Sequence, residues 1–364
     1  MTNSDVVFNK VTKVFSEGSA REVYAVDEVD FEVTQGKFVS LLGPSGCGKT
    51  TTLRLIAGFE FPTSGDIFLR GDRVNDTPPQ KRNVAMVFQS YGLFPHMTVE
   101  GNVSYGLKVQ GLSKNEIRGR VSDSLDLVDL SGLEDRSVEQ LSGGQQQRVA
   151  LCRALVTQPD VMLFDEPISN LDAKLRKGTR EQVRSIQQEL EITSVYVTHD
   201  QTEAMSIADE LMIMHEGKIR QVGKPDEIYA RPQSEFVADF IGEANFLDGS
   251  IINVEDHVEV DLTNIPLKNN LHFNQVNSFS TGDNVQVLVR PEAVDITEVD
   301  TGDFNGKVQF SHYTGATATY SIKLEEGSEI DVQVANPQEQ GLLSEGDQIG
   351  LKLHRNSLHI LPKG

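Results

Sequence analysis

The segment Gly43-Pro-Ser-Gly-Cys-Gly-Lys-Thr50 has residue types and a spacing that suit the binding of phosphate groups. Its glycines let backbone N–H groups turn towards phosphate oxygens, and a helix that starts at the loop adds positive potential. Lys49 is placed to reach the β- and γ-phosphates, and Thr50 is placed to put its hydroxyl on Mg²⁺. The loop follows the apolar run Lys37–Leu42 and precedes a helical pattern over Thr50–Ile56. We therefore expect a nucleoside triphosphate to be bound by Gly43, Pro44, Ser45, Gly46, Cys47, Gly48, Lys49, Thr50 and Thr51.

A second apolar segment, Val161–Phe164, ends in the acidic pair Asp165 and Glu166. A carboxylate at a strand end beside a phosphate loop can hold Mg²⁺ directly or through water, which is the role expected for Asp165. Glu166 is placed to polarise an attacking water as a general base. Without the phosphate loop, a solvated acid pair at a strand end would be favoured instead. Together, the two segments predict hydrolysis of the bound triphosphate.

Leu141-Ser-Gly-Gly-Gln145, directly before a helical pattern, offers a second site for an anion. A serine hydroxyl, glycine N–H groups and a helix N-terminus favour negative charge there, while an N-cap with a flexible turn is the structural alternative. With this motif the chain resembles the ATP-binding cassette (ABC) ATPases. The resemblance implies that Ser142, Gly143, Gly144 and Gln145 close on the γ-phosphate held by the phosphate loop of a second copy. It therefore implies a homodimer with two ATP molecules between its subunits.

Further segments match the same family in order along the chain. Gln89 matches the glutamine that contacts Mg²⁺ and water and responds to the membrane partner, and Ser169–Asp172 matches a loop that runs along the dimer seam. His199 follows an apolar strand and matches a histidine near the γ-phosphate. A neutral imidazole there can hydrogen-bond both phosphate and a catalytic carboxylate. The resemblance thus implies catalytic roles for Glu166, His199 and Gln89, and Mg²⁺ ligands in Thr50, Gln89 and Asp165.

An aromatic ring near the N-terminus holds the adenine in this family, and Phe15 is the candidate here. Tyr24 is the alternative, because an insertion at residues 16–22 separates the two rings. Either ring can also simply pack within the β region.

The elements that must position these residues alternate between strands and helices over about the first 240 residues. The strand candidates are short apolar runs: Lys37–Leu42, Val84–Phe88, Val161–Phe164, Ser194–Val197 and Leu211–Met214. The helical patterns lie at Thr50–Ile56, Lys114–Leu130, Gly144–Thr157, Leu171–Leu190 and Thr202–Ala208. This alternation predicts an α/β fold with a largely parallel sheet. The resemblance adds a P-loop NTPase cassette over residues 1–240, with an N-terminal antiparallel β subdomain and a helical subdomain at about 89–160.

After residue 240 the segments become short and β-like, which predicts a small barrel or sandwich over residues 241–364. The strand candidates are Asn284–Val289, Gly306–Phe310, Ala318–Leu324 and Glu329–Val334. The fragment Val289-Arg-Pro-Glu-Ala-Val294 resembles part of the OB-like β-barrel domain, called TOBE, that importer ATPases append for regulation. Residues 243–364 hold 7 Lys+Arg and 19 Asp+Glu, a net charge of −12, which argues against a nucleic acid as the ligand.

Across all 364 residues, 33 Lys and Arg stand against 54 Asp and Glu, a formal net charge of −21. Such a chain lacks the positive field that nucleic-acid binding needs and would be repelled by an anionic membrane surface. Only two cysteines, no secretory leader and no run of about 18 apolar residues lead us to expect a reducing compartment and no membrane span. We expect a peripheral location on the cytoplasmic face of the cell membrane, held by protein partners.

A motor ATPase without a membrane segment needs partners to move. The whole chain resembles the ATPase subunits of prokaryotic solute importers, which implies integral-membrane permease subunits and, indirectly, an extracellular solute-binding protein. The apolar stretch within residues 89–113 is a candidate docking surface for a permease or a part of the helical core. Phrases such as Tyr91-Gly-Leu-Phe-Pro-His-Met97 are most similar to ferric-ion importers, then to polyamine (spermidine/putrescine) importers. Sugar, sulfate and phosphonate importers share much of the same sequence.

Two other classes of protein are alternatives to an importer ATPase. A soluble ABC protein that acts on DNA or ribosomes usually carries two cassettes or a long coiled-coil insertion, whereas this chain has one of each motif and no heptad run. A nucleotide-binding regulator without motor activity would have an impaired site, which the intact motif residues oppose. These comparisons favour the importer ATPase.

Overall fold

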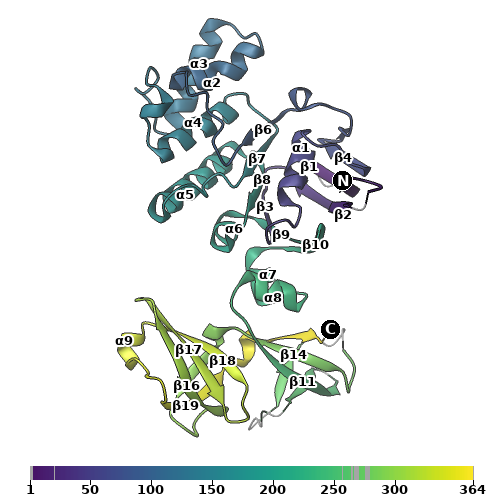
Figure 1. Ribbon diagram of the computed structural model, residues 1–364, viewed down its shortest axis with the longest axis vertical. Coiled ribbons are helices and arrows are strands. Elements are labelled where there is room, and N and C mark those ends of the chain that lie inside the picture. Colours follow the sequence, from purple (N-terminus) through teal and green to yellow (C-terminus); the bar gives the residue numbers. More distant parts are fainter. Residues whose placement is uncertain are drawn as a thin grey trace. The chain divides into compact units, whose positions relative to one another are not determined.

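Residues Phe38–Leu42 form strand β3, whose five side chains are all buried at the centre of a six-stranded sheet (Figure 1). The strand order is β10-β9-β3-β8-β7-β6, and every pair is parallel except β9 with β10. The other strands are β6 (Val84–Val87), β7 (Val161–Asp165), β8 (Thr193–Thr198), β9 (Glu210–His215) and β10 (Lys218–Gly223). Parallel strands are covered on both faces, which explains their continuous apolar sequences. The predicted α/β fold with a largely parallel sheet is confirmed.

The computed structural model describes residues 3–19, 21–255, 257–263, 265, 270–274 and 279–363. These residues form two compact units, Met1–Asp226 and Glu227–Gly364. The units therefore meet earlier in the chain than the boundary after residue 240 that the sequence pattern suggested. Each unit has its own hydrophobic core.

An antiparallel sheet of order β2-β1-β4-β5 stands beside the parallel sheet in the first unit. Its strands are β1 (Ser4–Phe15), β2 (Val23–Thr34), β4 (Ser64–Leu69) and β5 (Asp72–Arg73). Helix α1 (Lys49–Ala57) joins the two sheets, because its buried Leu53 and Ile56 belong to one core with Phe8 of β1 and Leu41 of β3. The phosphate loop precedes this helix, so both sheets determine where the loop lies.

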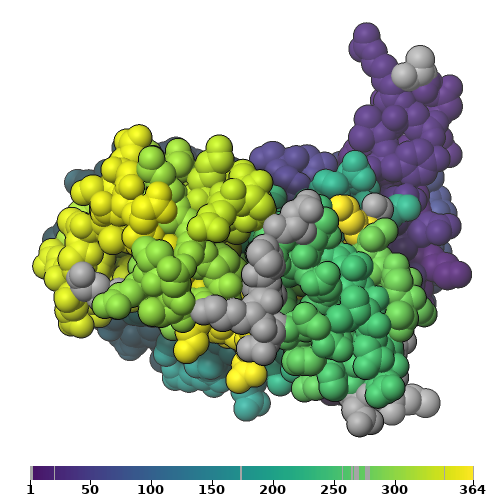
Figure 2. Space-filling model, turned by 90° about the horizontal axis from the view of Figure 1, so that it is seen from below, coloured from purple at the N-terminus to yellow at the C-terminus, as the bar shows by residue number. Residues whose placement is uncertain are grey.

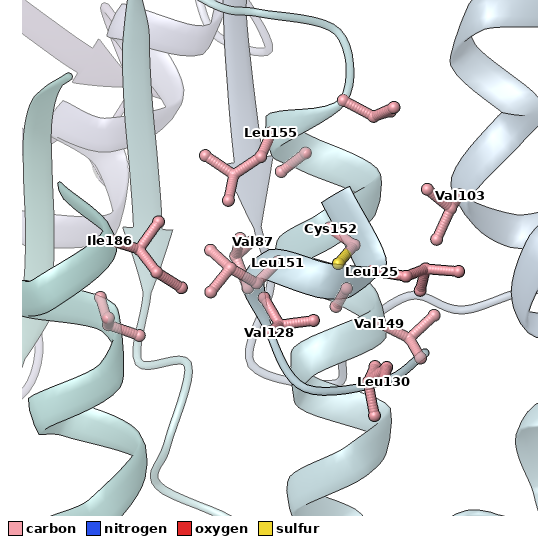
Figure 3. Close-up of a cluster of buried hydrophobic side chains, with 14 of the residues drawn as sticks. Val87, Val103, Leu125, Val128, Leu130, Val149, Leu151, Cys152, Leu155 and Ile186 are labelled. Atoms are coloured by element: carbon pink, nitrogen blue, oxygen red, sulfur yellow. The ribbon is translucent and has the colours of Figure 1, made fainter. Parts of the chain in front are cut away.

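A helical part packs on the other side of the parallel sheet. It contains α2 (Val99–Val109), α3 (Lys114–Leu127) and α4 (Gly143–Leu155). Figure 3 shows α4 at the centre of the cluster, with Leu125 and Val103 from the other two helices and Val87 from β6 around it. The remaining helices of this unit, α5 (Ala173–Leu190) and α6 (Gln201–Ile207), follow β7 and β8. Packing of α4 against both neighbours fixes the start of that helix, where Ser142 lies.

Two five-stranded antiparallel sheets make up most of the second unit, in the orders β13-β12-β11-β14-β20 and β15-β19-β16-β17-β18. The first contains β11 (Asn245–Val254), β12 (Val258–Leu262), β13 (Leu271–Phe273), β14 (Asn284–Val289) and β20 (His359–Pro362). The second contains β15 (Val294–Thr297), β16 (Phe304–Tyr313), β17 (Thr317–Leu324), β18 (Glu329–Ala335) and β19 (Gln348–Leu353). Both sheets enclose one core, which confirms the predicted barrel-like β domain.

The chain's last strand, β20, pairs with β14 from the middle of the unit. In Figure 2 yellow atoms from the end of the chain accordingly lie beside green atoms of earlier strands. Helix α8 (Glu235–Ile241) packs on this sheet, where its Ala238 contacts Leu288 and Leu361. Arg290 adds hydrogen bonds to the carbonyls of Ala238 and Gly242 (2.8 and 3.0 Å). These contacts explain why residues after Glu227 belong to the second unit.

Candidate functional site

The loop between β3 and α1 has a backbone that only glycine adopts easily. Gly46 and Gly48 have φ angles of 81° and 111°, in the left-handed region that side chains disfavour. A Cβ on Gly43 would lie 2.3 Å from the carbonyl oxygen of Met214, and one on Gly48 would lie 2.1 Å from that of Ala25. Strands β9 and β2 therefore contact the loop from outside, and a side chain at Gly43 or Gly48 would clash with them. Only glycine at these positions lets the loop backbone face a ligand.

Lys49, the first residue of α1, is buried beneath this loop. Its Nζ donates hydrogen bonds to the carbonyl oxygens of Gly43 (2.6 Å) and Pro44 (2.9 Å) and lies 3.7 Å from Cys47 Sγ. The ammonium group has no ion-pair partner among the described residues. An anion in the loop can therefore replace the carbonyl oxygens as its partner.

Thr50 and Asp165 bring two oxygen atoms together at the ends of two elements. Thr50 Oγ1, on the first turn of α1, donates to Asp165 Oδ1 at the end of β7 (3.3 Å). Burial raises the pKa of Asp165 above its ordinary value and the nearby Glu166 charge raises it further, while the Thr50 hydrogen bond acts in the opposite direction. A cation held by this pair would offset the cost of the buried charge.

Glu166 lies at the centre of a set of polar contacts from three strand ends. His199 Nδ1 lies 3.1 Å from Glu166 Oε1, and Gln89 Nε2 donates to Glu166 Oε2 (3.5 Å) and to Ser169 Oγ (3.2 Å). Asn170 Nδ2 in turn donates to the backbone oxygen of Gln89 (2.9 Å). Because parallel strands end at the same sheet edge, residues far apart in sequence meet here. The structure thus brings together the side chains of Gln89, Glu166 and His199.

The backbone of Glu166 is itself unusual, with a φ angle of 45°. Its N–H donates to the carbonyl oxygen of Val197 on β8 (3.0 Å), and its carbonyl accepts from Ser169 Oγ (3.0 Å). Left-handed backbone at a glutamate is strained and persists where the surroundings determine it. The strained turn directs the carboxylate towards the His199 ring, where a carboxylate can accept a proton from water.

Comparisons with known proteins agree with this geometry. Residues 26–169 match the ABC transporter family and residues 287–361 match the TOBE domain. An Fe(3+) ions import ATP-binding protein of Photorhabdus laumondii is 44% identical over 99% of this chain and 98% of its own length. A spermidine/putrescine import ATP-binding protein of Mesorhizobium japonicum is 44% identical over 96% of both.

The chain belongs to the ABC transporter family.

A solved structure supports the same assignment. A dimeric ATP-binding cassette in a post-hydrolysis state, bound to ADP and Pi, is 31% identical with a TM-score of 0.54. The match covers 60% of this chain and 98% of that one. The predicted class, an ABC transporter ATPase made of a cassette and a TOBE domain, is therefore confirmed. So is the resemblance to the group that contains ferric-ion and polyamine importers.

The signature segment of this ABC ATPase lies at the N-terminus of α4. Ser142 caps the helix and forms a capping box with Gln145, with hydrogen bonds of 3.3 and 3.0 Å between backbone N–H groups and side chains. Ser142 and Gly143 are exposed, and a Cβ on Gly143 would lie 3.4 Å from Leu171. No hydrogen bond or ion pair among the described residues joins Ser142–Gln145 to Lys49, Asp165 or Glu166. Because Ser142 and Gly143 are exposed, a ligand from outside the chain can reach them.

The two aromatic candidates for the adenine lie at the ends of β1 and β2. Phe15 is 38% exposed with Lys13 Nζ 4.9 Å from its ring centre, and Tyr24 is 53% exposed. Phe15 pairs with Val23 while Tyr24 pairs with Val14, so the two rings point to opposite faces of the strand pair. Only one of them can therefore face a given nucleotide.

Three residues near the site escaped the motif analysis. Arg176 on α5 and Glu203 on α6 lie behind His199, and Arg153 on α4 holds the segment after β6 through hydrogen bonds to two carbonyl groups there. Each acts through contacts between segments distant in sequence. The sequence therefore carried no spacing signal for them.

Proposed function

We propose that this chain is the motor subunit of an ABC importer, most specifically of one that takes up ferric iron. The observation that supports the ATPase mechanism is the contact of the Glu166 carboxylate with the His199 imidazole and the Gln89 amide. These side chains lie at the sheet edge where Lys49 and Thr50 also lie. Import as the direction of transport, and ferric iron as the solute, are proposed from the names of relatives that match over nearly their full length. The location that follows is the cytoplasmic face of the membrane.

In this proposal the loop Gly43–Thr51 surrounds the phosphates of ATP with backbone N–H groups. Lys49 Nζ exchanges the loop carbonyls for β- and γ-phosphate oxygens. Thr50 and Asp165 would hold Mg²⁺, with Gln89 as a further ligand, because oxygen atoms are the ligands that this ion prefers. When bound, Mg²⁺ neutralises charge on the β- and γ-phosphates. The described residues hold no cluster of three or more His, Cys, Asp or Glu that could bind a metal ion.

Glu166 accepts the proton of the attacking water, and the contacts around it determine its orientation. His199 keeps the carboxylate in place by donating from Nδ1 to Glu166 Oε1. Gln89 holds the other carboxylate oxygen and so links the catalytic carboxylate to the segment that follows β6.

A second copy of the chain completes each site in this proposal. Ser142, Gly143, Gly144 and Gln145 of one copy contact the γ-phosphate held by the other, where the helix N-terminus favours negative charge. The exposure of Ser142 and Gly143 supports this arrangement. ATP therefore closes the dimer and hydrolysis reopens it. Phe15 stacks on the adenine, with Tyr24 on the opposite face as the alternative.

Permease subunits dock on the exposed apolar face of α2 and the segment before it. Tyr105 is 43% exposed and Val109 is 72% exposed, and they line a groove with Met97 and Gly101. The same helix buries Val103 and Leu107 in the core. Within the described ranges no helix is long and apolar enough to span a bilayer. The extracellular solute-binding protein then acts through the permease rather than on this chain.

A trapping experiment tests the ATPase mechanism. We expect the Glu166→Gln variant to bind ATP without turnover and to elute as a dimer in gel filtration, because the base is absent while the binding groups remain. Lys49→Met, which removes the phosphate contact, is the matched variant and should stay monomeric. A Glu166→Gln variant that remains monomeric with ATP, or that keeps full turnover, would contradict the two-copy mechanism.

Uptake measurements test the solute. Cells that lack this gene should lose uptake of labelled ferric iron, and the wild-type gene should restore it whereas Glu166→Gln should not. Loss of spermidine uptake instead would assign the chain to the polyamine group, which the spermidine/putrescine relatives make the second candidate. Unchanged uptake of both would direct the search to sugar, sulfate and phosphonate, with the ATPase mechanism unaffected.

A further inference from the structure

Arg176 connects the loop after β7 with the residues that flank His199. Its Nη2 donates to the carbonyl oxygen of Leu171 (3.1 Å) in the segment Ser169–Asp172, which precedes α5. On its other side Nη1 lies 3.5 Å from Asp200 Oδ2, and Nε lies 3.8 Å from Glu203 Oε1. Nε is buried and has no hydrogen-bond acceptor among the described residues.

Glu203 in turn holds the backbone on both sides of His199. Its Oε2 accepts from Thr198 Oγ1 (2.8 Å) and from the Tyr196 hydroxyl (3.2 Å), while its backbone N–H donates to Asp200 Oδ1 (3.1 Å). The ring closes because the N–H of Asp200 donates to Thr198 Oγ1 (2.9 Å). Glu203 is only 3% exposed, so this ring of contacts is shielded from water and held firmly.

A continuous set of contacts thus runs from Leu171 to Glu166. It passes through the guanidinium of Arg176 to Glu203, through the ring around residues 198–200, and through the His199 Nδ1 contact to the carboxylate. Arginine suits the first step, because its planar fork can donate to a carbonyl and face two carboxylates at once. A lysine offers a single charged nitrogen and cannot do both.

We propose that Arg176 is a positioning residue that couples the segment Ser169–Asp172 to His199, so that a shift of this segment moves the His199 ring relative to Glu166. In this arrangement Arg176 contacts Leu171, Asp200 and Glu203, and it acts on Glu166 only through His199. This inference rests on the proposed roles of Glu166 and His199. Through Arg176, the segment Ser169–Asp172, which is expected to lie along the dimer seam, would control hydrolysis at the Glu166 of its own chain.

Steady-state ATPase of the full-length chain tests the coupling. We expect Arg176→Met to lower kcat by about 10- to 100-fold, because a misplaced catalytic group costs that much, while KM for ATP stays within about twofold. Arg176→Lys should recover part of kcat, since it keeps the charge beside Glu203. Lys177→Met, one residue along α5 and exposed, is the matched control and should behave as the wild type.

The deciding measurement combines Arg176→Met with His199→Gln. If Arg176 acts through His199, the double variant has the kcat of His199→Gln alone, whereas independent effects would multiply. Should Arg176→Met fail to fold in thermal unfolding, Arg176→Lys is used in the same two backgrounds. Unchanged kcat in Arg176→Met, or multiplying effects in the double variant, would overturn the coupling. A His199→Gln variant that hydrolyses ATP as fast as the wild type would instead refute the proposed roles on which it rests.

Discussion

Backbone geometry at single residues determines what the phosphate loop can accept. Gly46 and Gly48 both have positive φ angles, but only Gly48 has a neighbour that a side chain would strike, the carbonyl oxygen of Ala25 at 2.1 Å. A Cβ on Gly46 would meet nothing within 4 Å. Substitutions of the two glycines therefore distinguish two costs: Gly46 reports the cost of the left-handed backbone alone, and Gly48 reports that cost together with a steric clash.

This difference gives a prediction that needs no nucleotide. Gly46→Ala should lower the free energy of unfolding by about 1 kcal/mol, the cost of left-handed backbone at alanine. Gly48→Ala should cost about 2 kcal/mol more, because the loop must also move away from β2. Urea unfolding of the full chain measures both values. Equal losses in the two variants would show that β2 does not hold the loop in place.

The same contacts show what sequence reasoning could and could not find at this scale. Lys49, Thr50, Asp165 and Glu166 belong to short motifs, in which the chemistry requires fixed spacing along the chain. Arg176 and Glu203 belong to no such motif, because their partners lie on other elements and only the folded chain brings them together. Residue types at local spacing were therefore predictable, and the side chains that position them were not.

At the scale of elements, continuous apolar strands were predictable and helix α2 was not. The runs that became β3, β7, β8 and β9 are buried on both faces, so their sequences stand out. Helix α2 contains two glycines, an asparagine and three valines in eleven residues, which gives it a poor helical signal. Its packing against α4 supplies the stability that its sequence does not, as in many helices of folded proteins.

The end of α1 depends on one buried charge. Arg82 is 6% exposed, and it donates to the carbonyl oxygens of Leu55 and Ile56 at the helix end (2.6 and 2.8 Å) and to those of Val74 and Thr77. Burial lowers the pKa of this arginine from its usual value, but the carbonyl groups and the helix dipole suit a cation.

Arg82→Met should therefore lower the free energy of unfolding by about 3 kcal/mol, because it leaves several buried carbonyl groups without donors. The neighbouring Lys81 is exposed, so Lys81→Met serves as the control and should change stability little. Urea unfolding followed by circular dichroism compares the two. If Arg82→Met lowers the free energy of unfolding by no more than Lys81→Met does, water molecules replace the arginine as donors to these carbonyl groups.

Helix α4 is tied to the segment after β6 by Arg153. Its Nη1 and Nη2 donate to the carbonyl oxygens of Gly92 and Tyr91 (2.6 and 2.9 Å), and its guanidinium lies 5.7 Å from the centre of the Phe94 ring. Tyr91 and Gly92 both have φ angles near 60°, so the guanidinium holds an unusual turn. The helix that Ser142 caps is thus joined directly to the segment proposed to meet the permease.

We expect Arg153→Met to separate hydrolysis from transport. ATPase of the isolated chain should change by less than about threefold, since no catalytic side chain is lost, whereas solute uptake should fall by about tenfold because the turn at Tyr91 loosens. Arg118→Met on α3, an exposed arginine, is the control. Equal losses of ATPase and uptake would show that Arg153 supports the whole fold rather than coupling.

On the scale of the whole molecule, the two units have separate cores and different charge. The first unit carries the motif residues, and the second carries −12 of the net charge between residues 243 and 364. The fragment Val289–Val294, which supported the TOBE resemblance, has a structural reason for its sequence. Arg290 lies 4.2 Å from the Tyr229 ring and donates to carbonyl groups of residues 238–243.

His359 is the group through which acid should act on the second unit. Burial on β20 lowers the pKa of its ring from the ordinary value, the Arg231 charge lowers it further, and the hydrogen bond with the Pro232 carbonyl (3.0 Å) partly compensates. The unfolded state then binds the proton first as pH falls. Stability that is present above about pH 6.5 is therefore lost as pH falls towards the lower pKa of the folded state.

Hydrogen exchange of the β14 and β20 amides in the full chain, corrected for intrinsic rates, should therefore show less protection at pH 5.5 than at pH 7.5. In His359→Gln this loss should shrink, while in His312→Gln, an exposed control on β16, it should persist. The same loss in all three proteins would assign the acid sensitivity to the carboxylates of the unit instead.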